Sequence, residues 1–150
     1  MDITINQTKN TTDFEKCARL MADSEPWITL KRDFNGCLAA FQGDYREVYI
    51  VKENNILVGF AIIQMVGTFK GYIQSILVVD EYKGKGIGSM MLEYCESRIF
   101  NESKNVFMCV SSFNQRAYKL YKKLGYETIG ELKDFIVKGH SEILLRKSIP

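Results

Sequence analysis

Three glycines within five positions, Gly84, Gly86 and Gly88, separate an apolar run from an amphipathic segment. The run at 72–79 reads YIQSILVV and predicts a strand covered on both faces, and the segment after the glycines predicts a helix. Glycine permits backbone conformations and close approaches that side chains forbid. Consecutive amide N–H groups in such a loop, next to the partial positive charge of a helix N-terminus, favour an anion such as a pyrophosphate. A flexible turn with solvated lysines is the alternative interpretation.

The glycine spacing separates this loop from two common nucleotide-binding loops. A P-loop continues into Lys-Ser or Lys-Thr, and neither pair follows Gly88. The dinucleotide pattern G-x-G-x-x-G needs a third glycine where Ser89 or Met91 stands. The sequence also offers no convincing set of metal-binding carboxylates, so kinase-like transfer of a phosphoryl group is disfavoured.

The whole chain, residues 1–150, predicts a single α/β (α+β) domain. Alternating or continuous apolar runs predict strands, and two of them meet at a tight turn formed by Asn54 and Asn55. Together with an N-terminal strand they predict a mixed central β-sheet of about seven strands flanked by about four helices. The expected strands cover 47–53, 56–65, 72–79, 105–110, 126–132 and 141–147, and the first two helices cover 12–21 and 29–42.

Apolar residues at spacings of three and four predict which sides of the last two helices face the core. One helix follows the glycine loop, and the other begins at Asn114 and ends at Gly125. The residues expected to point inward are Met91, Tyr94, Cys95 and Ile99 in the first of these helices, and Ala117, Leu120, Tyr121 and Leu124 in the second.

Charge and composition exclude several classes of function. The 20 Lys and Arg residues against 18 Asp and Glu residues give a formal net charge of +2, which is too balanced for electrostatic binding to nucleic acid or to an anionic membrane. No apolar stretch reaches the length of a membrane span, and no secretory signal pattern is present, so we expect a soluble cytoplasmic protein. Four separated cysteines and a single histidine form no metal-binding pattern, so no metal is expected.

The strand, the glycine loop and the following helix resemble the acetyl-coenzyme A (acetyl-CoA) binding motif of the GNAT superfamily of N-acetyltransferases. That family carries Arg or Gln, two residues, Gly, one residue, and then Gly or Ala; Lys83, Gly86 and Gly88 fall in this register, with lysine in the first place. A second block at 114–126 is similar to the family's Asn-x-x-Ala-x-x-Leu-Tyr-x-x-x-Gly-Phe segment. The joint occurrence of both blocks, within about 47–145, is more specific than either block alone.

The resemblance implies a site for acetyl-CoA as the acetyl donor. Asn114 contacts the cofactor in this interpretation, and Tyr121 lies near the thioester sulfur. The main chain that pairs with the pantetheine arm belongs to Leu77, Val78 and Val79. The amides that hold the pyrophosphate belong to Lys83, Gly84, Lys85, Gly86, Ile87, Gly88 and Ser89.

The implied reaction is the transfer of an acetyl group to a primary amine by direct attack in a ternary complex. Tyr121 is the candidate general acid, because a phenol with a pKa near 10 is protonated at neutral pH; a core aromatic is the alternative. A glutamate five residues before the asparagine serves one branch of the family, the ribosomal-protein N-terminal acetyltransferases, and Cys109, which we expect to be a buried core thiol, stands there in this chain. Glu81 is the candidate base, unless it is a solvated turn residue, and an amine that loses its proton to solvent needs none.

The acceptor and the partners are the least constrained predictions. We expect acceptor specificity from the segment 24–29, where Trp27 either binds substrate or packs the loop against the core. Whether the amine belongs to a small molecule, a peptide or a protein stays open. Phe69 and Tyr72 are expected to be exposed near a hairpin tip, where they are candidates for a homodimer contact. A non-catalytic acyl-CoA-binding module of the same fold is the alternative function, distinguished by binding of acetyl-CoA without amine-dependent thiol release.

Overall fold

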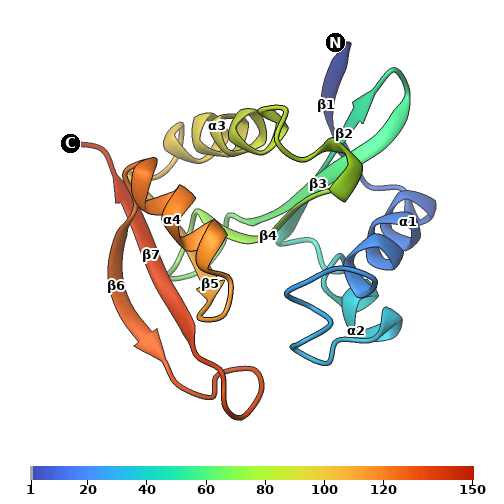
Figure 1. The fold of residues 1–150 in the computed structure, drawn as a ribbon. Helices are drawn as coiled ribbons and strands as arrows, with labels where there is room; N and C mark the ends of the chain where they lie inside the picture. The colour runs from blue at the N-terminus through green and yellow to red at the C-terminus, as the bar shows by residue number, and fades with distance from the viewer. Residues whose placement is uncertain (1) are drawn as a thin grey trace.

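The computed structural model describes residues 2–150 and contains one seven-stranded mixed sheet with four α-helices (Figure 1). This confirms the predicted α/β architecture. Among residues 2–150, no helix has both the length and the apolar content that crossing a membrane requires. The elements are β1 (Ile3–Thr8), α1 (Thr11–Ala22), α2 (Phe34–Ala39), β2 (Arg46–Glu53), β3 (Ile56–Gln64), β4 (Tyr72–Val78), a 3-10 turn η1 (Asp80–Tyr82), α3 (Ile87–Phe100), β5 (Asn105–Ser111), α4 (Gln115–Lys123), β6 (Glu127–Leu132) and β7 (Glu142–Ser148).

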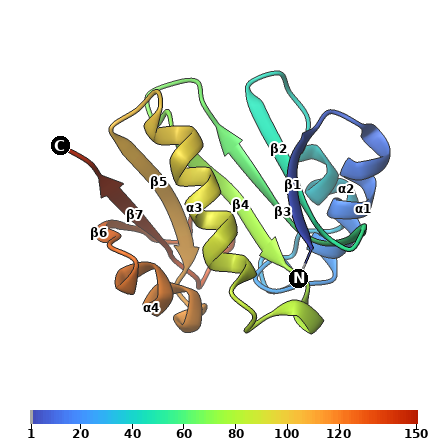
Figure 2. The same ribbon diagram turned by 90° about the horizontal axis from the view of Figure 1, so that it is seen from above.

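Helices cover both faces of the sheet, with α3 and α4 on one face and α1 and α2 on the other (Figure 2). Strand β2 shows why, because successive side chains of a strand point to opposite faces. Tyr49 and Val51 join the cluster that contains the α3 side chains, whereas Val48 and Ile50 join the cluster formed by α1 and α2. The sheet therefore separates two hydrophobic cores.

The predicted hairpin of β2 and β3 is confirmed. Asn54 and Asn55 have φ angles of 51° and 70°, the left-handed values that a two-residue turn of this kind requires. Asparagine tolerates this conformation better than most residues, because its short polar side chain bonds to the local backbone.

The expected helix at 29–42 is wrong in length, since α2 covers only Phe34–Ala39. Lys31 has a φ of 58°, a left-handed conformation that interrupts any continuous helix. Asp33 then starts a new helix by accepting a hydrogen bond from the Gly36 amide at 2.8 Å. The segment before it forms successive turns instead.

Two expected inward positions are also wrong. Tyr94 is 38% exposed and packs edge-on against the buried Tyr49. Leu120 is 39% exposed, because the side of α4 on which it lies borders a cleft instead of packing against the sheet.

The sheet divides between β4 and β5. Within residues 2–150 these parallel strands pair at two positions, Tyr72 with Phe107 and Ile73 with Met108. The neighbouring antiparallel pairs β3–β4 and β5–β7 extend over longer stretches, with one register shift in β3–β4 between Ile62 and Ile63. Beyond Ile73 the two strands separate, and this division positions the candidate site.

Candidate functional site

A cleft of about 380 Å³ opens where β4 and β5 separate, with α3 and α4 as its walls. The segment before α2 borders it from another side. Most of the residues predicted from the sequence line this one space. They are Trp27, Leu77, Val78, Lys83, Gly84, Gly86, Gly88, Ser89, Asn114 and Tyr121.

The glycine loop leaves the N-terminus of α3 open. Gly84 and Gly86 have φ angles of 79° and 83°, and neither has a heavy atom within 4 Å of where a Cβ would stand. These glycines are therefore required by conformation rather than by space. Gly86 is the N-cap and no side chain caps the helix, whose first backbone bond runs from the Met90 amide to the Gly86 carbonyl. The amides of the first turn point out of the helix end as free donors for an anion.

Lys83 and Lys85 are engaged with their neighbours. The Lys83 ammonium lies 2.7 Å from the Asp80 carboxylate and holds the pKa of that carboxyl below its usual value. The Lys83 amide also donates to the Asp80 carbonyl, at 3.2 Å. The Lys85 ammonium lies 5.1 Å from the centre of the Tyr82 ring. Neither lysine points a free charge at the cleft, so the backbone is the stronger anion-binding element.

The remaining predicted residues lie beside the cleft and do not line it. Glu81 is exposed on η1, and its role as a base stays a prediction. The Val79 amide donates to the Val58 carbonyl at 2.8 Å, so this N–H is already used. Ile87 buries its side chain and leaves only its main chain for binding.

Helix α4 contributes Asn114 and Tyr121. The Asn114 Oδ1 accepts a hydrogen bond from the Ala117 amide at 3.3 Å and caps the helix, so its side-chain NH₂ group remains for contacts in the cleft. Burial raises the pKa of Tyr121 to about 12, with a smaller contribution from Cys95. The Tyr121 hydroxyl therefore stays protonated at neutral pH, as a general acid must.

A smaller cavity of about 120 Å³ continues into the gap between the strands and shares Trp27, Asn114 and Tyr121 with the cleft. Glu142 also lines it, and sequence reasoning missed this residue. A single glutamate at the start of a strand carries no periodic signal. Only the pairing of β7 with β5, which sets Glu142 opposite Ser111, brings the carboxylate here.

Two predictions about side chains around this cavity are resolved by the structure. Tyr72 is not exposed as expected; it is half-buried and lines the cavity, whereas Phe69 is 52% exposed. Cys109 is half-buried, and burial raises the pKa of its thiol, which disfavours a thiolate nucleophile.

Within residues 2–150, no group of three or more His, Cys, Asp and Glu side chains is placed to hold a metal ion.

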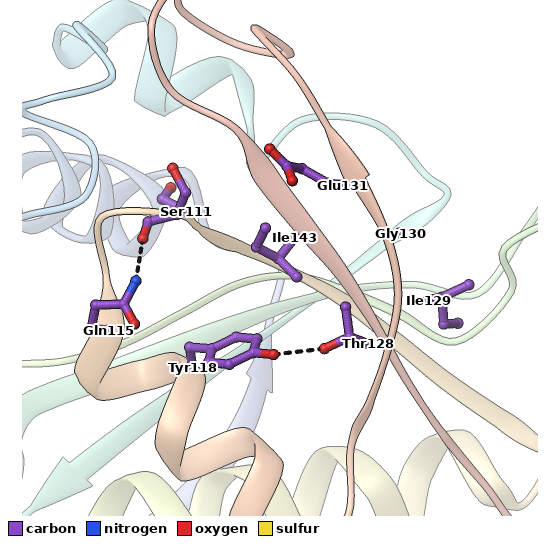
Figure 3. Close-up of a pocket in the computed structure, with 9 residues that line it drawn as sticks. Ser111, Gln115, Tyr118, Thr128, Ile129, Gly130, Glu131 and Ile143 are labelled. Carbon is purple, nitrogen blue, oxygen red and sulfur yellow. Dashed lines mark hydrogen bonds between the residues drawn. The ribbon is translucent and has the colours of Figure 1, made fainter.

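A third cavity, of about 340 Å³, lies between α4 and the β6–β7 hairpin (Figure 3). The Tyr118 hydroxyl spans it to the Thr128 hydroxyl at 2.8 Å. Its lining contains none of the site residues predicted from the sequence. This cavity provides a useful contrast, because it lies on the same helix as Tyr121 without the features of the cleft.

Known proteins resemble this chain in sequence and in fold. The sequence model described as "Acetyltransferase (GNAT) family" matches residues 9–126. An N-alpha-acetyltransferase from Saccharolobus solfataricus is 29% identical over 82 residues, which are 53% of this chain and 49% of that protein. The chain thus spans about half the length of this curated relative.

Two solved structures share the fold across nearly the full chain. The ribosomal-protein-S18-alanine N-acetyltransferase from Escherichia coli has a TM-score of 0.78 at 20% identity, covering 99% of this chain and 94% of that one. An aminoglycoside 6′-N-acetyltransferase complexed with coenzyme A has a TM-score of 0.77 at 16% identity, covering 100% and 98%. At these identities the likeness concerns the fold.

Proposed function

The chain belongs to the acetyltransferase (GNAT) family, and on that premise we propose that it transfers an acetyl group from acetyl-CoA to a primary amine by direct attack in a ternary complex. One observation carries the proposal: the open N-terminus of α3 and the protonated Tyr121 face the same cleft at the division of the sheet. Amides at one wall and an acid at the other suit a donor with a pyrophosphate and a thioester.

The cleft fits acetyl-CoA by its donors and its shape. The first-turn amides of Ile87, Gly88 and Ser89 bind the pyrophosphate, and the two left-handed glycines before them keep the approach clear of side chains. The edge of β4 that faces β5 has no strand partner beyond Ile73 among residues 2–150. Within 77–79 the Val79 amide is already bonded to the Val58 carbonyl, so the main chain of Leu77 and Val78 is left to bind the amide groups of the pantetheine arm.

The thiolate of coenzyme A that leaves in this reaction must take up one proton. Acetyl-CoA supplies the activated acetyl group, and a neutral amine attacks its carbonyl carbon. Tyr121 donates its phenolic proton to the departing thiolate, and its raised pKa keeps that proton in place until the carbon–sulfur bond breaks. Trp27, which lines both the cleft and the smaller cavity, forms a wall of the acceptor site.

The test is thiol release from acetyl-CoA in the presence of polyamines, amino sugars, amino acids and short peptides. Tyr121→Phe is expected to lower kcat by about 100-fold or more, the usual contribution of a general acid, without weakening acetyl-CoA binding. Tyr118→Phe is the matched control, because this hydroxyl lies on the same helix but bonds to Thr128 in the third cavity. It is expected to leave kcat unchanged.

Two outcomes contradict the proposal in different ways. Acetyl-CoA binding without turnover of any amine favours the non-catalytic acyl-CoA-binding module. No binding of acetyl-CoA contradicts the assignment of the glycine loop itself.

A further inference from the structure

Glu142 is a buried carboxylate with one oxygen left for a ligand. Its residue is 6% exposed, and the Ser111 hydroxyl donates to Oε2 at 2.6 Å. No donor within residues 2–150 bonds to Oε1. Within residues 2–150, the side-chain atoms that are fully enclosed and have no hydrogen-bond partner are Glu53 Oε2 and Arg146 Nε. Glu142 Oε1 has no partner either but is not fully enclosed, so it is accessible from the cavity. A buried charge in this state requires a partner.

The cavity around Glu142 contains no cation of its own. Among the described residues that line it, none is Lys, Arg or His, and Glu142 is the single acidic group. Most of the wall is apolar, formed by residues such as Trp27, Leu30, Ile76 and Met108. The volume of about 120 Å³ admits a narrow group and excludes a bulky one. The cavity therefore fits a primary ammonium group on a narrow apolar stem.

Glu142 and Tyr121 reach this cavity from different elements. Tyr121 comes from α4 and also borders the cleft assigned to acetyl-CoA, whereas Glu142 comes from β7 inside the sheet. An amine held at Glu142 thus lies in the space that adjoins the thioester end of the cleft.

We propose that Glu142 is a catalytic residue that binds the ammonium group of the acceptor and takes its first proton, an inference that rests on the proposed acetyl transfer. The neutral nitrogen then forms a bond to the acetyl carbon, and the carbon–sulfur bond breaks. The nitrogen loses two protons in all: one goes to Glu142 and then to solvent, and the other replaces the proton that Tyr121 gives to the thiolate. The products are the acetamide, the thiol and one proton.

The electrostatics of the site agree with this role. Burial raises the pKa of Glu142, against the lowering effects of the Ser111 hydrogen bond and of Arg32. The other titratable groups that face it are Tyr72 from β4 and Cys109 from β5. The Glu142 charge contributes to the raised pKa of each. Since the proton acceptor must be ionised, kcat/KM is expected to rise with pH through a pKa above the usual carboxyl value.

The experiment compares the wild type with Glu142→Gln and Glu131→Gln on the best amine found in the panel. Glutamine keeps an oxygen for the Ser111 hydroxyl but neither binds an ammonium through charge nor accepts its proton. Glu131 is a matched control on the same hairpin, where it accepts from the Ser141 hydroxyl at 2.6 Å and borders the third cavity (Figure 3).

We expect Glu142→Gln to lower kcat/KM by about 100-fold and to abolish the acid limb of its pH profile. Glu142→Gln is expected to keep the wild-type affinity for acetyl-CoA. Glu131→Gln is expected to keep the wild-type kcat/KM and its pH profile. Wild-type kcat/KM with the same acid limb in Glu142→Gln overturns the proposal while leaving the acetyl transfer intact. A wild type that turns over no amine contradicts the proposed function, and the Glu142 role with it.

A binding measurement removes the dependence on catalytic rates. n-Butylamine at neutral pH, where it is an ammonium ion, is titrated by NMR into the protein saturated with coenzyme A, and n-butanol serves as the uncharged probe. The expected result is a dissociation constant at least tenfold higher in Glu142→Gln for n-butylamine and equal constants for n-butanol. Equal affinity for the ammonium in both proteins overturns the proposal.

Discussion

Helices α3 and α4 cover the same face of the sheet, but they are held there in opposite ways. The body of α4 has no buried residue, and Leu120 on its apolar side is 39% exposed. The body of α3 is anchored in the core. The buried side chains of α3 are Ile87, Met91, Leu92, Cys95 and Ile99.

The N-termini of the two helices show the reverse. Helix α3 starts at Gly86 without a side-chain cap, whereas the Asn114 side chain caps α4. One helix leaves its backbone donors open, and the other leaves its apolar side open. This difference teaches that a helix can present its N-terminal amides to a ligand when its body is buried, or its apolar side when its N-terminus is capped. Their combination suits a ligand with an anionic group and an apolar arm.

The largest expected effect concerns the two helix bodies. Ile99→Ala removes a fully buried side chain from α3 and is expected to lower the free energy of unfolding by about 3 kcal/mol. Leu120→Ala removes a partly exposed side chain from α4 and is expected to cost less than about 1 kcal/mol. Urea denaturation measures both. Equal losses in the two variants would contradict the contrast between an anchored helix and an open one.

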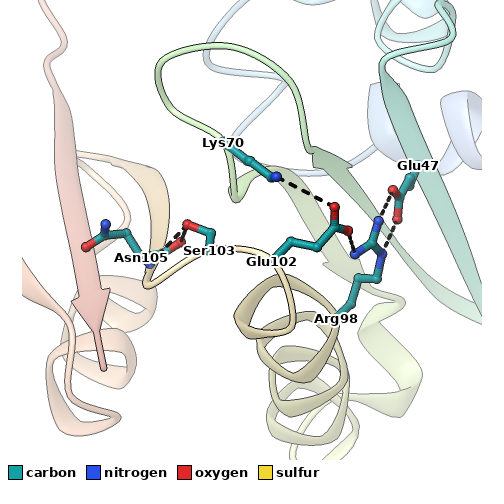
Figure 4. A network of polar contacts seen from close by, with 6 residues as sticks. All are labelled: Glu47, Lys70, Arg98, Glu102, Ser103 and Asn105. Carbon is teal, nitrogen blue, oxygen red and sulfur yellow. Dashed lines mark hydrogen bonds and ion pairs between the residues drawn. The ribbon is translucent and has the colours of Figure 1, made fainter. Parts of the chain in front are cut away.

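Polar anchoring of α3 gives the next effect (Figure 4). The Arg98 guanidinium donates to both carboxylate oxygens of Glu47 on β2, at 2.9 and 2.6 Å, and it also pairs with Glu102, which lies 3.6 Å from Lys70. No ion pair among residues 2–150 involves α4. Arg98→Met is expected to lower the free energy of unfolding by about 2 kcal/mol at neutral pH.

This loss depends on pH. Burial would raise the pKa of Glu47, but hydrogen bonds from Arg98 and Tyr49 outweigh it and leave the pKa lowered. A lowered folded pKa stabilises the protein above the usual carboxyl pKa, and this contribution disappears as the pH falls through the lowered value. The difference between wild type and Arg98→Met therefore shrinks in acid. Lys122→Met, an exposed change on α4, is the control and is expected to stay within about 0.5 kcal/mol at any pH.

The smallest expected effect separates two glycines of the loop. Gly86→Ala places a Cβ in a left-handed conformation and is expected to cost about 1 kcal/mol. Gly88 lies inside α3, and a Cβ there meets Val78 Cγ2 at an ordinary 3.7 Å, so Gly88→Ala is expected to be neutral or to stabilise by up to about 1 kcal/mol. Thermal unfolding distinguishes the two. The same sign of change in both would contradict the assignment of Gly86 as a conformational requirement.

Sequence reasoning succeeded where a local rule decides the structure. The turn at Asn54 and Asn55 and the loop at Gly84 and Gly86 depend on residues that tolerate positive φ, and such residues can be recognised one by one. The start of α4 at Asn114 follows from a cap that is equally local. Gly84, Gly86 and Asn114 line the cleft, but the position of the cleft depends on the separation of β4 from β5.

Sequence reasoning failed where distant segments decide. The exposure of Leu120 depends on the separation of β4 from β5, which apolar periodicity does not record. Glu142 joins the site because β7 inserts between β5 and β6, an order that no local pattern encodes. The pairing of Arg98 with Glu47 likewise depends on how α3 crosses the hairpin of β2 and β3.

The most direct test of the account is an NMR titration of the protein with coenzyme A, followed through backbone amides and side-chain methyl groups. The account predicts large shifts for the amides of Ile87, Gly88 and Ser89 in α3 and for the methyl groups of Leu120 in α4, with the methyl groups of Ile129 in the third cavity unchanged. Saturable shifts at Ile129 with none in the first turn of α3, or no shifts at all, would contradict it.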